Sequence, residues 1–466
     1  KALLEALNSG KLSQEAANTN VRRILEYVFR TPTFAKYKYS DKPNLTENAK
    51  VTRNAAAEGM VLLKNEKNAL PFADKQKEVS LFGVTSYAWI TGGTGSGSVN
   101  NKHTVSLLEG LNAAGYKLDK ELVDLYTPHA EKEVVAEKER RKARGVLALP
   151  ERLPEIKMDD AFIAKKAASS EIAFVTLGRN SGEGGDRVVD NDFNMANEEI
   201  EMLDKISKAF HAKGKKVVVI LNIGGVIETA SWKDKADAIL LAWQPGQEGG
   251  HSVADVVSGK INPSGKLTMT FPAKYSDTPS AKNFPGFPVN NPTEVTYEEG
   301  VYVGYRYFNT FNIKPSYEFG FGTSYTTFDY SGIKLSSPAF KDKLTVSVTV
   351  KNTGKVAGKE VVQLYLAAPS KSIDKPKEEL KAFAKTKELK PGESQTLTLT
   401  LSPKDLASFL ENKSAWIAEA GEYKVLIGAS SLNIKQTASF SVPKEITVEK
   451  VKKAFELDSK FTELKP

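Results

Sequence analysis

The chain of 466 residues contains no cysteine. Without thiols it can form no disulfide, no thiolate zinc site and no cysteine nucleophile. Histidine is also scarce, since only His103, His129, His211 and His251 occur. Their spacing follows no metal-ligand pattern. We therefore expect no bound metal, and we interpret His251, which lies at an expected helix start, as a cap or surface residue.

Long apolar runs are missing as well, and no stretch reaches the length of a membrane span. The start, Lys1-Ala2-Leu3-Leu4, has neither an initiator Met nor a signal peptide, so we expect a processed or truncated chain. The lack of cysteine is compatible with a reducing cytosol and with a periplasm. Of these locations we favour a periplasmic or secreted one.

A net charge of +8 raises the question of nucleic-acid binding. The lysines are scattered among acids, however, and the one tight basic cluster, at 140–144, ends an acid-rich segment that begins at Glu131. This pattern predicts a solvated helix stopped by Gly145. No aromatic residues are interleaved to stack on bases. We expect no nucleic-acid partner.

A chain of this length suggests about three domains of roughly 150 residues each. Residues 1–30 show helical spacing with Ser13 as N-cap, and 31–44 read as a linker. From 45 to 272, helices alternate with short apolar strands, which predicts a βαβ sandwich with a mostly parallel sheet. The expected strands are 60–63, 79–84, 172–177, 216–222, 238–243 and 268–271, and the expected helices are 49–58, 106–114, 196–212 and 251–257.

The rest of the chain has a different pattern. Residues 273–325 read as a long connector. Residues 326–443 contain short alternating strands separated by turns, which predicts an antiparallel β-sandwich. Residues 444–466 form a lysine-rich tail with a weakly amphipathic stretch at 448–457. The expected fold class is therefore α/β plus all-β.

A glycine-rich acidic loop, 178–187, follows the expected strand that ends at Leu177. Four glycines allow this loop to take positive φ angles and to approach a ligand closely. Glu183 lies between flexible neighbours, which suits a proton donor that swings to a bond and away again. The alternative is an acidic surface turn, and the loop alone does not decide between the two.

The sequence Ser-Gly-Glu-Gly-Gly-Asp-Arg around Glu183 resembles the acid/base loop of glycoside hydrolase family 3, the family of β-glucosidases and related exo-acting enzymes. Further segments resemble the same family in the expected order along nearly the whole chain. They are 58–65, 70–72, 243–250, 262–267, 304–308, 319–325, 352–354 and 360–365. By the same resemblance, the C-terminal sandwich is similar to a fibronectin type III domain.

The resemblance implies a retaining mechanism with two carboxyl groups, in which Glu183 is the acid/base. It also implies that a (β/α)8 barrel supplies an aspartate nucleophile and most sugar-binding residues. Residues 1–44 resemble only the end of that barrel and its linker. We therefore expect the barrel on a second polypeptide or a cleaved N-terminal part. The pKa of Glu183 should be raised by an apolar wall and by the nucleophile.

A second glycine-rich loop, 91–98, carries Trp89 just before it. It lacks the lysine of a P-loop and the third glycine of a dinucleotide loop. Trp89 either stacks on a sugar ring or serves as a buried anchor, and both interpretations stay open. Trp89 and Arg187 are our candidates for substrate binding, and Arg187 with Asp186 is also expected to hold the acidic loop.

Glu248 and the aromatic segment 297–308 each allow a structural and a functional interpretation. Glu248 is a second candidate carboxylate, but we expect it to brace its own loop, 244–250. The aromatic segment 297–308 is expected to pack between domains rather than to face a sugar. In open α/β sheets, ligand loops gather at the carboxyl ends of strands, where Glu183, Trp89 and the 244–250 loop all lie.

The expected partner is a carbohydrate with terminal β-D-glucose, and no cofactor is implied by the resemblance. A homo-oligomer is left open. Within the family, a β-xylosidase is the alternative, while the loop around Glu183 argues against the β-N-acetylglucosaminidase branch. Two other function classes stay open as alternatives: a phosphorylase-like enzyme and a non-catalytic carbohydrate-binding fragment.

Overall fold

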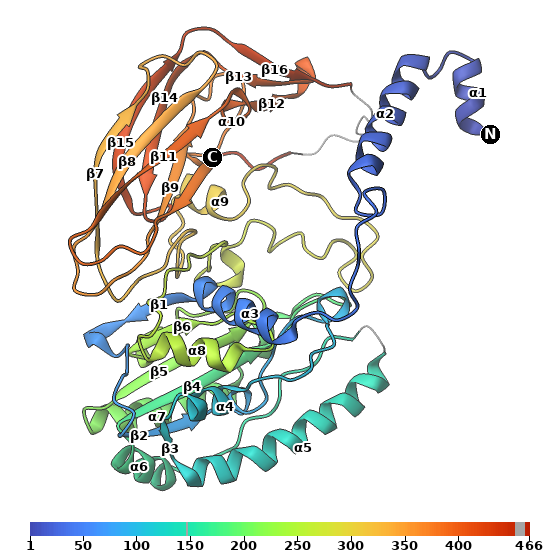
Figure 1. The fold of residues 1–466 in the computed structure, drawn as a ribbon. Helices are drawn as coiled ribbons and strands as arrows, with labels where there is room; N and C mark the ends of the chain where they lie inside the picture. Colours follow the sequence, from blue (N-terminus) through green and yellow to red (C-terminus); the bar gives the residue numbers. More distant parts are fainter. Residues whose placement is uncertain (146–147, 453–461) are drawn as a thin grey trace. The chain divides into compact units, whose positions relative to one another are not determined.

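The computed structural model describes residues 1–145, 148–452 and 462–466 (Figure 1). The chain divides into two units, 1–48 and 49–466. The first contains α1 (Ala2–Asn8) and α2 (Gln14–Arg30). Ser13 caps α2 as predicted, its Oγ accepting a hydrogen bond of 3.1 Å from the amide of Ala16. The prediction of continuous helix over 1–30 is wrong, because a turn with Gly10 at positive φ separates the two helices.

The second unit begins within α3 (Leu45–Gly59) and contains a sheet of six strands. Its order is β1-β6-β5-β4-β2-β3. All neighbours are parallel except β1, which pairs antiparallel with β6. The predicted mostly parallel sheet is thus confirmed. The bounds are β1 (Val61–Asn65), β2 (Glu78–Phe82), β3 (Lys117–Leu118), β4 (Ile172–Arg179), β5 (Lys216–Ile223) and β6 (Ala238–Leu241).

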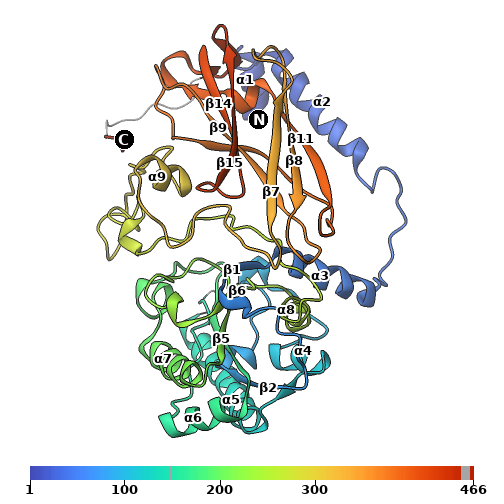
Figure 2. The ribbon, with the colours of Figure 1, turned by 90° about the vertical axis from the view of Figure 1, so that its left-hand side faces the viewer.

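Helices cover both faces of this sheet (Figure 2). One face packs against α5 (Lys120–Arg144), α6 (Asp160–Ser169) and α7 (Asn197–Ala212). The other packs against α4 (Leu107–Ala113) and α8 (Gly249–Val257). The central strands β4 and β5 are buried almost throughout, which explains their continuous apolar sequence. Helix α5 ends before Gly145, as the charge pattern predicted.

The last predicted strand of this domain, 268–271, is wrong. The chain there pairs instead with the connector, through Leu267 to Phe321 and Phe271 to Tyr317, without forming a ladder. Farther along, the connector contains α9 (Tyr305–Thr310). The ring of Tyr305 stacks on Phe319 with centroids 4.5 Å apart, and its hydroxyl accepts a 2.7 Å hydrogen bond from the amide of Leu380. The expected packing between domains is therefore confirmed for Tyr305, whereas Tyr297 of the same segment is exposed.

The C-terminal β-sandwich has two main sheets, β10-β9-β14-β15 and β11-β8-β7, with a small sheet β12-β13-β16 beside them. Strand β16 lies in the segment predicted to be a tail, and it pairs antiparallel with β13. Of the amphipathic stretch 448–457, residues 453–457 lie outside the described residues. The bounds are β7 (Phe328–Leu335), β8 (Leu344–Asn352), β9 (Val361–Ala367), β10 (Glu379–Lys385), β11 (Ser394–Leu401), α10 (Pro403–Leu406), β12 (Ser408–Leu410), β13 (Ala415–Ala418), β14 (Gly421–Gly428), β15 (Ile434–Val442) and β16 (Ile446–Lys450).

Ion pairs join the α/β domain to the β-sandwich. Lys266 lies 2.9 Å from Glu360, and Glu58 pairs with both Lys359 and Lys385. Among the described helices, none combines the length and apolar character that crossing a bilayer requires.

Candidate active site

The loops after β2, β4 and β6 meet at the carboxyl edge of the parallel sheet. Asn222, near the end of β5, is fully buried and holds two of them. Its side chain accepts a 2.8 Å hydrogen bond from the amide of Ile90 and donates to the carbonyls of Ile90 and Trp243. Gly246 donates to the carbonyl of Thr91, so the glycine-rich loop also contacts the 244–250 loop. The predicted gathering of loops at this edge is confirmed.

Glu183 lies at this edge and contacts the loop 91–98. Its carboxylate accepts hydrogen bonds from Ser96, 2.6 Å from Oγ and 3.1 Å from the amide nitrogen. Its carbonyl accepts a bond of 2.9 Å from the hydroxyl of Thr94. Gly95 and Gly182 have positive φ, and a Cβ on Gly95 would overlap the Glu183 carboxylate. The two glycines thus permit the close approach of the two loops.

The environment of Glu183 differs from the expectation in one respect. The hydrogen bonds from the Ser96 side chain and amide lower the pKa of the Glu183 carboxyl from its ordinary value. The expectation of a raised pKa rested on an apolar wall and on a neighbouring nucleophile. Neither is part of the described contacts of Glu183, whose side chain is exposed. In this chain the two hydrogen bonds from Ser96 therefore favour the ionised form of the carboxyl.

Replacing Ser96 with Ala should raise the pKa of Glu183, because the variant loses the Oγ donor and keeps only the amide donor. The measurement is a carboxyl ¹³C NMR titration of the chain. Ser98→Ala, on an exposed residue of the same loop, is the matched control and should leave the titration unchanged. An identical Glu183 titration in Ser96→Ala and the parent chain would contradict the assigned contact.

Two arginines fix the ends of the acidic loop. Arg179, at the end of β4, donates from Nε to the carbonyl of Asp192 at 2.7 Å. Arg187 donates to the carboxylate of the same Asp192, at 2.7–3.1 Å, and to the carbonyl of Val226 at 2.7 Å. The bracing role of Arg187 is thus confirmed, but its partner is Asp192. The exposed Asp186, the partner expected from sequence, is not in the described ion pairs of Arg187.

Trp89 is only 8% exposed. Its indole nitrogen lies against Gly249, and among the described residues it has no hydrogen-bond partner. The structure therefore favours the buried-anchor interpretation for the greater part of this ring. Its remaining exposed atoms line a cavity that is described below.

Glu248 braces its loop, as expected. Its two carboxylate oxygens lie 2.6 Å from Nε2 of His103 and 2.7 Å from Nδ1 of His251. Burial raises the pKa of Glu248, but the hydrogen bonds from His251 and His103 outweigh that effect and leave the pKa below its ordinary value. His251 is thus neither a cap nor a free surface residue. No group of three acidic or histidine side chains suited to a metal ion is present within the described residues.

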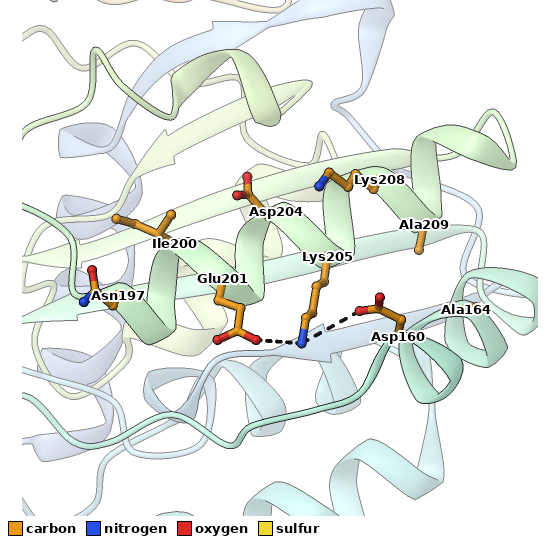
Figure 3. A pocket seen from close by; sticks show the side chains of 9 residues that line it. All are labelled: Asp160, Ala164, Asn197, Ile200, Glu201, Asp204, Lys205, Lys208 and Ala209. Carbon is orange, nitrogen blue, oxygen red and sulfur yellow. Dashed lines mark ion pairs between the residues drawn. The ribbon is translucent and has the colours of Figure 1, made fainter.

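A groove of about 580 Å³ lies between α6 and α7 (Figure 3). Lys205 crosses it and lies 2.7 Å from Glu201 and 3.8 Å from Asp160. Its lining comes from helix surfaces, without a residue from the loops at the carboxyl edge of the sheet. We assign no site to this groove, because Lys205, which crosses it, is already paired with Glu201 and Asp160.

Sequence reasoning missed Ser96, Asp192, Asn222 and His103. Ser96 and Asn222 act through contacts with residues 87 and 132 positions away, respectively. The only sequence signal for Ser96 was its place in a glycine-rich loop after a strand. That signal predicted a flexible loop at the sheet edge without indicating what the loop would contact.

Comparison with known families agrees with this architecture. Residues 60–305 match the glycosyl hydrolase family 3 C-terminal domain, and residues 360–431 match a fibronectin type III-like domain. β-Glucosidase A of Butyrivibrio fibrisolvens is 36% identical, over 90% of this chain and 55% of that protein. An exo-α-(1→6)-L-arabinopyranosidase of Bifidobacterium breve is 31% identical, over 94% of this chain and 55% of that protein.

Among solved structures, β-glucosidase 3B from Thermotoga neapolitana in complex with α-D-glucose has a TM-score of 0.86 and 46% identity. The match covers 96% of this chain and 61% of that one. The chain therefore spans little more than half the length of these relatives. Because the family domain matches more than half of the residues, the chain belongs to glycoside hydrolase family 3.

Proposed function

We propose that this chain supplies the acid/base half of a retaining, exo-acting β-glucosidase that releases terminal non-reducing β-D-glucose. The observation that carries the proposal is the position of Glu183. Its carboxylate lies at the carboxyl edge of the sheet, in a glycine-flanked loop that is fixed at both ends by arginines. The names of the relatives support glucose as the released sugar.

In a retaining mechanism, one carboxylate attacks the anomeric carbon while a second carboxyl group, roughly 5 Å away, protonates the leaving oxygen. Glu183 is the proposed proton donor and then the base that activates water. The nucleophile is an aspartate on the barrel that this sequence does not include. That barrel would come from a second polypeptide or from another part of the same gene product.

Assembly with the barrel must also change the ionisation of Glu183. Ser96 now stabilises the carboxylate, whereas a proton donor must hold its proton near the operating pH. A nearby aspartate and exclusion of water both favour the protonated form. We infer that Glu183 exchanges the Ser96 contact for the glycosidic oxygen when the assembled site binds substrate.

Mass spectrometry under denaturing conditions tests the assignment of the nucleophile to the barrel and of the acid/base to this chain. The assembled protein is incubated with a 2-deoxy-2-fluoro-β-glucoside, which traps the glycosyl-enzyme intermediate. We expect the added glycosyl mass on the barrel and none on residues of this chain. A label on this chain would overturn the assignment of the nucleophile. Affinity for glucosides without turnover in the assembled protein would instead support a carbohydrate-binding role.

The substrate class is tested with aryl β-glucoside, β-xyloside and α-L-arabinopyranoside. The proposal predicts the highest kcat/KM for the β-glucoside. The arabinopyranoside is included because one relative is named for that activity. Turnover that requires inorganic phosphate would favour the phosphorylase alternative.

A further inference from the structure

A cavity of about 450 Å³ lies where α5 passes the carboxyl edge of the sheet. Three segments form its walls: 84–92 after β2, 134–141 on α5, and 150–155. Gly178, Asn180 and Glu199 complete the lining. The volume falls within the roughly 300–1,000 Å³ that is usual for small-molecule pockets. The function proposed above gives this cavity no role.

One part of the wall is apolar. It consists of Trp89, Ile90, Val134 and Leu153, with Ala88 and Pro150 beside them. Trp89 adds only the small exposed part of its ring, and its indole nitrogen points to Gly249. Such a wall suits a ligand with an apolar ring face.

The charged groups of the lining balance one another. Lys138, Arg141 and Arg152 supply positive charge, and Glu137, Glu151 and Glu199 supply negative charge. Several of these are already paired, for example Glu199 with Arg179 at 2.7 Å and Glu137 with Arg144 at 2.8 Å. These three carboxylates of the lining are thus paired with arginines outside it, so a cationic ligand would lack a partner of its own and would be poorly compensated after desolvation.

Two hydrogen-bonding groups of the lining remain available. Glu155 accepts only from the amide of Val84, at 3.1 and 3.2 Å, among its described hydrogen bonds. Burial, together with the neighbouring Glu199, raises its pKa to about 8, which favours the protonated form, and a protonated carboxyl can donate a hydrogen bond. The Nε of Arg152 is buried and has no partner among the described residues. These groups suit hydroxyl oxygens.

From these features we propose that the cavity binds one neutral, hydroxyl-rich sugar of monosaccharide size, with D-glucose as the probe. An occupant would contact Thr91 and Gly92, three residues or fewer before Thr94, and Asn180, which directly follows Arg179. These positions are the roots of the two loops that meet at Glu183. Binding of a free sugar in the cavity would thus affect the acid/base loop. The inference concerns binding and does not require the proposed catalysis.

Nuclear magnetic resonance of the chain tests the proposal without any variant. The four tryptophans give four indole N–H signals. Titration with D-glucose should shift the Trp89 signal in a saturable way and leave that of Trp416, on β13, in place. Absence of a saturable Trp89 shift would overturn the proposal. Tighter binding of glucuronate than of glucose would also overturn it, because the lining would then favour a charged ligand.

A pair of adjacent variants locates the binding. Val134→Trp fills the cavity from α5. The next residue, Val135, is 62% exposed and lies outside the lining, so Val135→Trp is the control. We expect affinity for glucose to fall at least about tenfold in the first variant and to stay unchanged in the second. Equal affinity in both would contradict the site. If Val134→Trp does not fold, the smaller Val134→Phe serves the same comparison.

Discussion

Glu183→Gln should lower kcat/KM of the assembled enzyme for unactivated β-glucosides by about 10²–10⁴-fold, the usual contribution of a positioned general acid. The amide has nearly the same shape but cannot give a proton to the leaving oxygen. A glucoside whose leaving group is already a stable anion, such as 2,4-dinitrophenolate, needs no proton. Its glycosylation step should therefore be affected much less.

The pH profile gives an independent reading of the same residue. A general acid works only while it is protonated, so kcat/KM should fall as pH rises through the pKa of Glu183 in the assembled enzyme. This basic limb should disappear in Glu183→Gln. Steady-state rates across a pH series measure both effects.

Asp186→Asn is the matched control, because Asp186 is an exposed carboxylate of the same loop. It should retain parental activity on both substrates and the parental pH profile. If Asp186→Asn and Glu183→Gln behave alike, the loss reflects a disturbed loop and not a missing proton donor. Parental activity in Glu183→Gln would remove the acid/base assignment altogether.

The contrast between what the sequence predicts and what it misses follows from the range of each interaction. The strand β4 is predictable because its run 172–177 is short and mostly apolar, as a strand buried on both faces of a sheet requires. The loop after it is predictable as a loop because glycines cluster there. The position of Glu183 at the carboxyl edge then follows from the parallel sheet.

What the sequence does not contain is the identity of the contacts made across that edge. Ser96 reaches Glu183 from another strand's loop, so local spacing cannot reveal the bond that lowers the pKa of the carboxyl. Arg187 has an acidic neighbour in Asp186, yet its partner is Asp192, because the chain turns back at 189–193. Adjacent opposite charges in the sequence did not predict the ion pair, because neighbouring side chains in an extended loop point in different directions.

The burial of Arg179 and Glu199 is also determined by tertiary contacts that local sequence does not reveal. In the sequence Arg179 lies in the glycine-rich loop 178–187, where no local pattern indicates a buried side chain. In the structure it is 2% exposed. Glu199, in the first turn of α7, is also buried and faces it, although its place in the sequence is typical of an exposed helix N-terminus. Only the tertiary packing of α7 on β4 brings the two together.

Arg179→Leu should therefore reduce the free energy of unfolding by about 3–5 kcal/mol, the usual cost of leaving one member of a buried ion pair without its partner. The pair is bidentate, with two nitrogen–oxygen distances of 2.7 Å to Glu199. Denaturant unfolding measures the change. The control is Lys120→Ala, which removes an exposed pair with Asp124 and should cost no more than about 0.5 kcal/mol. Similar losses in the two variants would contradict the argument.

The double variant Arg179→Leu/Glu199→Leu separates the two roles of this arginine. Removing both charges abolishes the unpaired carboxylate, so part of the lost stability should return. The hydrogen bond from Arg179 to the carbonyl of Asp192 does not return, and Asp192 is the residue that also holds Arg187. We therefore expect the double variant to recover stability but not the activity of the assembled enzyme. Full recovery of activity would show that the acid/base loop does not need Arg179 for its position.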